Sequence, residues 1–475
     1  MPVQNPCEEY NANLSRWTLV QDAVKGEAAI KAGRDLYLPL FLPHDEPRYK
    51  ALLQRAVFTG YTARTLKGLT GAVFRKPPET ELPPQVEYLS EDYDGSGESL
   101  DQLGKIVCDN LLQFGRIGLL VDHPSASEGL TKAQTDALNL RATIAPYPAV
   151  AVINWRAVKI GGALVLDMVT LKETASEAVD YFTMKETVQY RALMFDEART
   201  YMQRIFDKDG NQIGQDIYPK KADGKPWKEI PFVFIGATDN RPSVDDAPLY
   251  DLAVLNVAHY RNSADYEEAS HMHGQGTLFI NPGEMSAETF SALNPNGITV
   301  GARRGHVLGN GGSAMLLQME ANGAAFEAMK DKVEQMKAIG ARIVGLSRVQ
   351  ETAEAVKINA SSETSTLKTI AGNASEGIEK ALEFVCEFMG GDPEKATFTL
   401  NQDFFDQSMS PQEALVFLQL IDRGDIAQSD LRDRLRNTGW ISGDRTDDLI
   451  DKEAEKAKDD GVGLEKKKIL AKDAE

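Results

Sequence analysis

Two histidines, His271 and His273, form the most suggestive metal-binding pair in the sequence. Residues two positions apart on a helix point to different faces, so a single ion cannot easily meet both rings. Zinc sites favour histidines four positions apart or additional Cys ligands, and the neighbouring sequence supplies neither. A metal-dependent hydrolase that uses His271, His273 and nearby acids stays open as an alternative, but we expect no metal and no other cofactor.

Two acidic, glycine-containing segments, residues 92–98 and 207–211, have the composition of calcium-binding loops. Neither has the alternating acids before the glycine or the closing Glu at the twelfth position that such loops require. The first segment predicts a surface turn that caps a helix starting near residue 99. The second contains Asp209 followed by Gly210, which predicts a β-hairpin turn.

The motifs of common catalytic sites are absent from the sequence. It contains no GxxxxGK[ST] phosphate-binding loop, no GxSxG nucleophile motif and no HExxH zinc motif. Its six histidines are scattered, and no motif supports a nucleophilic triad. The sequence therefore predicts a protein that is not an enzyme.

Two basic groups stand out against an acidic background. Arg303, Arg304 and His306 lie close together, and Arg348 and Lys357 flank a polar segment further along the chain. Ordinary solvated surface explains each group. Transient contact with phosphate groups is the alternative, because Lys and Arg supply the affinity for nucleic-acid backbones.

A helical seam over residues 323–344 precedes that polar segment. Its large apolar side chains recur at steps of three and four residues, at Phe326, Met329, Val333, Met336 and Ile343. This spacing predicts a narrow apolar stripe that packs against other helices. Residues 345–353 carry few large apolar groups and predict an exposed loop, after which a second, longer helical pattern continues to residue 389.

A matching helix is predicted at 247–273, with Leu249, Ala253, Val257 and Tyr260 on one stripe. At about 1.5 Å per residue it would be about 40 Å long. A small mixed module of short strands and turns lies between the two helices, at 274–322. Earlier in the chain, helical patterns lead to a buried strand at 117–122. Period-two patterns then predict antiparallel strands at 149–154, 163–171, 187–195, 200–207, 211–217 and 230–235. The fold class is therefore α+β.

Composition narrows the class of protein. The 475 residues suggest two to four domains, and the net charge is −19. Such an acidic chain is a poor non-specific nucleic-acid binder, and the charge indicates either solubility or a surface that avoids an anionic polymer. The N-terminus lacks a signal peptide, and no window approaches the roughly 20 apolar residues of a membrane span, so no membrane association is expected.

Five stretches occur in an order that matches a known family: 49–77, 94–100, 114–122, 149–156 and 251–266. The first ends in Gly-Ala-Val-Phe-Arg-Lys-Pro, and the last reads Asp-Leu-Ala-Val-Leu-Asn-Val-Ala-His-Tyr-Arg-Asn-Ser-Ala-Asp-Tyr. Together they resemble bacteriophage portal proteins, the head-to-tail connectors of tailed phages, over residues from about 30 to 440. None of these stretches is a catalytic signature.

The resemblance implies a division of the chain into the parts of a portal subunit. These are a wing (1–246, a helical part plus an antiparallel β region), a first stem helix (247–273), a mixed α/β clip (274–322), a second stem helix (323–344), a tunnel loop (345–357), a long wing helix (358–396), and a helical crown with a charged C-terminal tail (397–475). The crown is short compared with the family pattern.

The resemblance also implies a function. Portal subunits form a ring of usually twelve copies at one capsid vertex of the virion and are made in the cytoplasm of the bacterial host. Double-stranded DNA passes through the ring, and the partners are the terminase large subunit, the capsid or scaffold protein and head–tail adaptors.

By this resemblance, three groups of residues carry the function. Arg348, Gln350, Glu351, Thr352 and Lys357 would face the DNA channel. Arg303, Arg304 and His306 would lie in the clip, and the stem seams from Leu249 to Tyr260 and from Phe326 to Ile343 would pack between subunits. A scaffold or adaptor protein without a channel is the other alternative.

Overall fold

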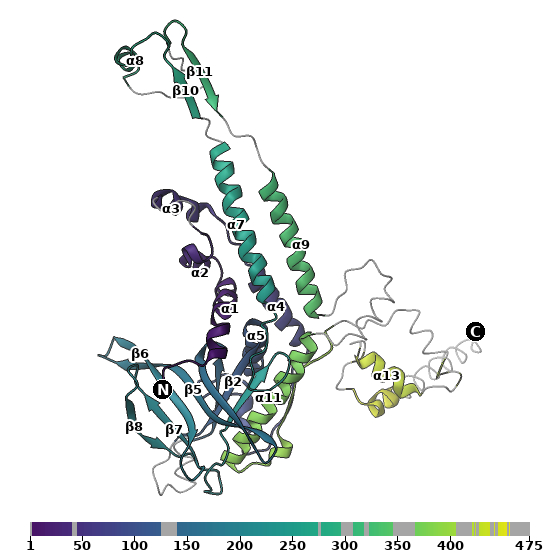
Figure 1. Ribbon diagram of the computed structural model, residues 1–475. Helices are drawn as coiled ribbons and strands as arrows, with labels where there is room; N and C mark the ends of the chain where they lie inside the picture. Colours follow the sequence, from purple (N-terminus) through teal and green to yellow (C-terminus); the bar gives the residue numbers. More distant parts are fainter. Residues whose placement is uncertain are drawn as a thin grey trace, which may run out of the picture. The chain divides into compact units, whose positions relative to one another are not determined.

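The computed structural model describes residues 2–39, 45–124, 140–273, 277–295, 307–317, 323–344 and 366–404, with shorter stretches at 420–421, 423, 427–437, 441, 445–453 and 456 (Figure 1). The chain divides into two units, Met1–Gln402 and Asp403–Glu475. Helices and antiparallel sheets both contribute to the first unit, so the predicted α+β class is confirmed.

The core of the first unit is a three-stranded antiparallel sheet. Its order is β3 (Thr143–Pro148), β2 (Arg116–Asp122) and β9 (Phe232–Gly236). The helix α5 (Leu100–Phe114) precedes β2 in the chain. Its N-cap is Ser99, whose side chain accepts a hydrogen bond from the Gln102 amide. The predicted buried strand and the predicted helix start are both confirmed.

The helix α11 (Thr366–Met389) packs closely on this sheet. A Cβ atom at Gly377 would lie only 2.4 Å from the Ile235 side chain of β9, so glycine permits the close approach of the helix to the strand. Two Asn side chains connect α11 to the turn that follows β9. The Asn373 side chain donates to the Gly236 carbonyl over 2.9 Å, and Asn240 donates to the Asn373 carbonyl over 3.2 Å.

The second sheet is a five-stranded antiparallel meander in which chain neighbours pair in order. Its strands are β4 (Val152–Ile160), β5 (Ala163–Ala178), β6 (Met184–Phe195), β7 (Tyr201–Phe206) and β8 (Gln212–Ile217). The predicted hairpin turn joins β7 to β8, where the Asp207 carboxylate accepts hydrogen bonds from the amides of Asp209 and Asn211. The predicted strand start at 149 is wrong, because residues Ala149–Ala151 form a 3₁₀ turn (η3) and β4 starts at Val152.

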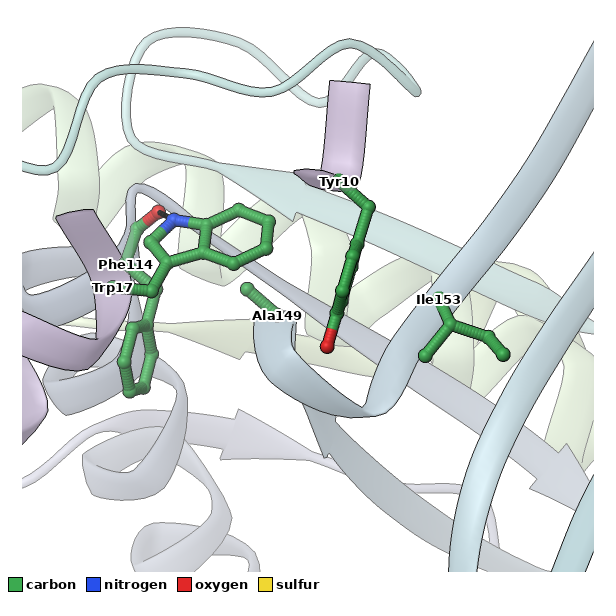
Figure 2. Packing of buried hydrophobic residues seen from close by; sticks show 5 residues of the cluster. All are labelled: Tyr10, Trp17, Phe114, Ala149 and Ile153. Atoms are coloured by element: carbon green, nitrogen blue, oxygen red, sulfur yellow. Dashed lines mark hydrogen bonds between the residues drawn. The ribbon is translucent and has the colours of Figure 1, made fainter. Parts of the chain in front are cut away.

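The N-terminal helices pack against α5, against α7 (Tyr250–His273) and against one another. They are α1 (Glu8–Lys25), α2 (Glu27–Ala32), α3 (Glu46–Arg55) and α4 (Tyr61–Val73). Figure 2 shows Tyr10 and Trp17 of α1 against Phe114, Ala149 and Ile153. The Trp17 indole donates to the Phe114 carbonyl over 2.9 Å, so the buried ring leaves its N–H paired.

A short strand pair joins distant parts of the sequence. The strand β1 (Glu79–Glu81) pairs antiparallel with β12 (Thr397–Thr399). The predicted C-terminal region begins at 397, whereas the second unit begins at Asp403. The difference arises because β12 is hydrogen-bonded into the first unit.

The described residues of the second unit are mostly helical. Its helix α13 (Gln428–Asn437) carries Arg432, which forms an ion pair with Asp451, and Arg436, which forms ion pairs with Asp433 and Asp447. Among the helices in the described ranges of both units, none combines the length and apolar content needed to cross a membrane.

Candidate assembly site on the paired helices

The helices α7 (Tyr250–His273) and α9 (Ala324–Val344) pack against one another and bracket a small module (Figure 1). The module contains β10 (Thr277–Asn281), α8 (Ala287–Leu293) and β11 (Ser313–Leu317), with β10 and β11 paired antiparallel. This arrangement agrees with the sequence expectation of two long helices around a mixed module.

One face of α7 is covered by its own chain. Ala253, Val257 and Tyr260 are buried there, and so is Leu249 immediately before the helix. The Tyr260 ring meets Phe58 edge-on, with ring centroids 6.0 Å apart. The helices α1, α3 and α4 contact α7 in addition to α9, so this stripe belongs to the core of the subunit.

Buried polar side chains add directional contacts to the same face. The Asn256 side chain accepts hydrogen bonds from the amide and hydroxyl of Thr62 and donates to the Thr59 carbonyl over 2.8 Å. The Ser263 hydroxyl accepts from the Val57 amide over 3.2 Å. These bonds satisfy backbone groups of the irregular segment between α3 and α4, and they hold that segment along α7.

A buried histidine lies between these contacts. The His259 ring meets Tyr61 edge-on at 5.5 Å between centroids. Burial lowers the pKa of His259 below its ordinary value, and the positive charge of Lys332 on α9 lowers it further. The ring is therefore held in its neutral form near pH 7.

The helix α9 presents a different surface. Among its described side chains, only Met336 and Ile343 are buried, Met329 and Val333 are half-buried, and Phe326 is 42 % exposed. The Phe326 ring lies 5.8 Å from that of Tyr266 on α7, and the Lys330 ammonium lies 4.3 Å from its centroid. The N-terminal half of the seam is thus less covered than its C-terminal half, with Phe326 exposed and Met329 and Val333 half-buried.

The predicted packing of the stem seam between subunits stays a prediction, and the burial of its side chains within one chain shows which of them are exposed. Leu249, Ala253, Val257, Tyr260, Met336 and Ile343 are buried within a single chain. The apolar spacing correctly indicates a buried stripe but does not say which surface covers it. Of the predicted seam, Phe326, Met329 and Val333 are the side chains that a second copy could still cover.

The predicted DNA-facing and clip residues lie outside the described residues. Arg348, Gln350, Glu351, Thr352 and Lys357 fall within 345–365, and Arg303, Arg304 and His306 fall within 296–306. Their roles remain predictions.

The two histidines of the candidate metal site both belong to the C-terminal end of α7. His271 is exposed near the end of α7, and His273 belongs to the last turn of the same helix. In the described part of the chain, no group of three or more His, Cys, Asp or Glu side chains could hold a metal ion.

In the acidic turn before α5, a carboxylate is hydrogen-bonded to backbone amides of the same turn. The Asp92 carboxylate accepts hydrogen bonds from the amides of Gly95 and Gly97 and forms an ion pair with Arg141. These amides lower the pKa of Asp92. The segment is a surface turn before the capped helix, as predicted.

Sequence reasoning missed two features of the first unit. The polar anchors Asn256 and Ser263 recur at helical spacing inside an apolar stripe, and that pattern is a usable signal for buried polar contacts. The exposed pair Tyr181 and Phe182 lies in a hairpin turn between two alternating segments. Their signal is two adjacent aromatic residues after a turn-forming Asp.

Comparison with known proteins gives one family model and several solved structures. A family model described as Domain of unknown function (DUF4055) matches residues 248–389, which contain α7, the small module, α9 and α11. The chain is similar, at 16 % identity and a TM-score of 0.40, to a chain in the neck of an empty gene transfer agent (GTA) particle with C6 symmetry. That match covers 83 % of this chain and 94 % of the other.

Two further solved structures are similar at the same identity and TM-score. One is the virion of a native GTA particle, with 81 % of this chain and 92 % of the other covered. The other is the neck of a native GTA particle with C12 symmetry, with 85 % and 98 % covered. No curated protein matches the sequence.

Proposed function

We propose that the chain is a non-enzymatic subunit of a phage-type portal, a ring at one vertex of a virion through which double-stranded DNA is packaged and ejected. The observation that carries the proposal is the order of elements. A wing of helices and antiparallel sheets precedes α7, a small module separates α7 from α9, and a long helix, α11, returns to the wing. This is the order of wing, stem, clip, stem and long helix that the resemblance implies.

The charge of the chain supports a channel through which DNA moves. Each copy carries −19, so twelve copies would carry −228 formal charges. Duplex DNA carries about one negative charge per 1.7 Å of axis, and an acidic wall repels it. Screening over ~8 Å at physiological salt keeps that repulsion short-ranged, which favours low friction over binding.

Within this function, the basic groups make brief phosphate contacts. Arg348 and Lys357 of the tunnel loop and Arg303 of the clip are the proposed contacts. The terminase large subunit and head–tail adaptors would dock at the clip, and the capsid or scaffold protein at the outer surface. Replacing Arg348→Glu and Lys357→Glu together should change DNA retention in packaged particles, and unchanged retention and packaging would contradict this role.

The mass of the purified protein is the first test of the ring. We expect a mass near a dozen subunits by light scattering and a ring with a central opening by electron microscopy. A protein that stays monomeric, both alone and together with its capsid and scaffold proteins, would contradict the proposal.

The exposed part of the α9 seam offers a sharper version of this test. The variant Phe326→Ser removes a ring that is 42 % exposed, so the stability of the monomer should change by less than about 1 kcal/mol. If this ring packs between subunits, the fraction of assembled rings should fall while the thermal midpoint of the monomer shifts by only a few degrees. Leu449→Ser, at a similarly exposed position of the second unit, is the matched control.

A further inference from the structure

The hairpin of β5 and β6 extends beyond both of its neighbours in the sheet. The strand β4 pairs with β5 only as far as Leu171, and β7 pairs with β6 only from Tyr190 onward. Residues 173–178 and 184–189 therefore pair, among the described residues, only with each other. The end of the hairpin is a two-stranded ribbon that projects from the sheet.

The root of this ribbon is held firmly. The Glu173 carboxylate accepts hydrogen bonds from the Tyr147 hydroxyl over 2.6 Å, from Arg191 over 2.7 Å and from Gln189 over 2.7 Å. Tyr147 belongs to β3 of the other sheet, so this partly buried group ties the base of the hairpin to the core of the unit. These hydrogen bonds fix the orientation of the ribbon where it leaves the sheet.

The turn at the end of the ribbon is also ordered by hydrogen bonds. The Val179 amide donates to the Thr183 carbonyl over 2.9 Å, and the Asp180 carboxylate accepts from the amides of Phe182 and Thr183 over 2.8 and 2.9 Å. Between these bonds, Tyr181 and Phe182 are 94 % and 92 % exposed. Their rings contact each other edge-on, with centroids 5.1 Å apart.

Two aromatic rings on a pre-ordered turn form a typical binding anchor. Aromatic side chains dominate interface energetics and lose little conformational freedom on binding when their backbone is already fixed. Each can bury roughly 150–250 Å². The turn therefore suits an apolar groove that accepts both rings.

The same unit contains such a groove. Its volume is about 420 Å³, and it lies between the start of β5, the strand β9 and the helix α11. Its exposed apolar surface comes from Leu164, which is 53 % exposed, and from the half-buried Leu166 and Pro242. The buried rings of Phe232, Phe234 and Phe384 lie beneath this surface, and Lys380 and Glu376 are exposed beside it.

A hairpin cannot fill the groove of its own chain. Leu164 of the groove and Ala178 beside the turn belong to one continuous strand. At about 3.3 Å per residue, that strand separates them by about 45 Å. The groove and the aromatic turn are therefore at opposite ends of the same strand, and an occupant must come from another molecule.

We propose that the turn at residues 179–184 of one copy inserts Tyr181 and Phe182 into the groove of a second copy. The charges on the two surfaces suit this contact, because Asp180 of the turn can meet Lys380, and Lys185 of the ribbon can meet Glu376. The contact joins two different surfaces of identical chains, so its repetition closes a ring when the rotation between copies closes. The inference rests on the proposed ring and names the contact that would join its subunits.

A photo-cross-linker placed at the turn tests this contact in the full-length protein. The change is Phe182→p-benzoylphenylalanine, an aromatic replacement at an exposed site, and the matched control is the same group at Tyr218, which is 45 % exposed in the same sheet region. We expect an intermolecular product from position 182 whose cross-linked peptides contain residues 164–166 or 229–234. The variant Leu164→Asp should remove that product.

A second measurement follows the strength of self-association. The double variant Tyr181→Ser and Phe182→Ser should weaken it by at least roughly ten-fold, because two anchor side chains are lost. Tyr218→Ser should leave it unchanged. Since all three side chains are exposed, unchanged circular dichroism and thermal midpoints are expected for each variant.

Three results would overturn the inference. Rings whose cross-links map elsewhere would remove the hairpin contact but leave the proposed portal function intact. A product within one chain that maps to residues 403–475 would assign the turn to the chain's own second unit. A protein without any intermolecular product at position 182 would also exclude the contact, whereas the mass measurement with capsid and scaffold proteins separately decides the proposed function.

Discussion

The helices α7 and α9 have similar lengths, 24 and 21 residues, but their own chain covers them very differently. The buried face of α7 includes Asn256, His259 and Ser263 in addition to its apolar stripe, and it contacts three N-terminal helices. On α9, only Met336 and Ile343 are buried among the described side chains. The first helix is therefore part of the subunit's core, whereas the second keeps apolar groups available to other molecules.

The two helices also differ in their charged side chains. The helix α7 carries four acidic side chains and one Arg, while α9 carries four basic and three acidic side chains. Two of the acids on α9 pair with lysines one turn away, Glu327 with Lys330 and Glu334 with Lys337. Such exposed pairs contribute little to stability, so α9 depends more on what it packs against than on its own surface.

The largest expected loss of stability comes from truncating a side chain on the buried face of α7. The variant Tyr260→Ala removes a fully buried ring and should lower the free energy of unfolding by about 3–5 kcal/mol. Urea unfolding followed by circular dichroism measures the change.

Two controls sharpen this result. Tyr266→Ala removes a ring that is 37 % exposed on the same helix and that packs on Phe326, so it should cost about 1–2 kcal/mol, clearly less than Tyr260→Ala. Tyr260→Phe should be nearly neutral, because the Tyr260 hydroxyl has no hydrogen-bond partner in the described part of the chain. Equal losses for Tyr260→Ala and Tyr266→Ala would contradict the difference between the two faces of α7.

A smaller effect is expected from the polar anchors. The variant Asn256→Ala leaves the Thr62 amide and the Thr59 carbonyl without their buried partner, which should cost about 1–3 kcal/mol. Ser270→Ala, at an exposed position of α7, should stay within about 0.5 kcal/mol and serves as the control. A neutral Asn256→Ala variant would show that packing alone holds the segment between α3 and α4.

The smallest effect concerns pH. Burial lowers the pKa of His259 below 6.5, so the unfolded chain takes up a proton before the folded chain does as the pH falls. Stability should therefore decrease below about pH 6.5, by at most about 1.4 kcal/mol per pH unit for this one group. Comparing urea midpoints at about pH 7.5 and about pH 5.5 measures the decrease, and His259→Phe should reduce it. An identical pH dependence in both proteins would remove His259 as the cause.

Much of the fold follows from local patterns in the sequence. The period of the apolar residues predicts both long helices and most strands of the five-stranded sheet, because one face of each element is buried. The edge strand β3 escapes prediction because Pro146 and Pro148 interrupt it, and proline is tolerated only where a strand has a free edge. Its partner strand β2 lies well before it in the sequence, since Asp122 pairs with Thr143 and Ile117 with Pro148, and no local pattern reveals this pairing.

The candidate site could be predicted less completely. Spacing indicates that Met336 and Tyr260 lie on apolar stripes, but it cannot tell a surface covered by the same chain from one covered by a second copy. The same limit applies to Tyr181 and Phe182, whose near-complete exposure depends on how far β5 and β6 extend beyond β4 and β7. Burial depends on how the whole chain packs, whereas the period of apolar residues identifies only the apolar face of a single helix or strand.

The pairing of β1 with β12 also sets an order of events during synthesis. Residues 79–81 find their partners only when residues 397–399 have left the ribosome, and α11, which covers the central sheet, is completed shortly before. Until then the N-terminal helices and the sheet are present without their cover, and contacts of such sequence separation form slowly. The paired helices and their small module are thus an insertion within one folding unit, which is closed last by its C-terminal strand.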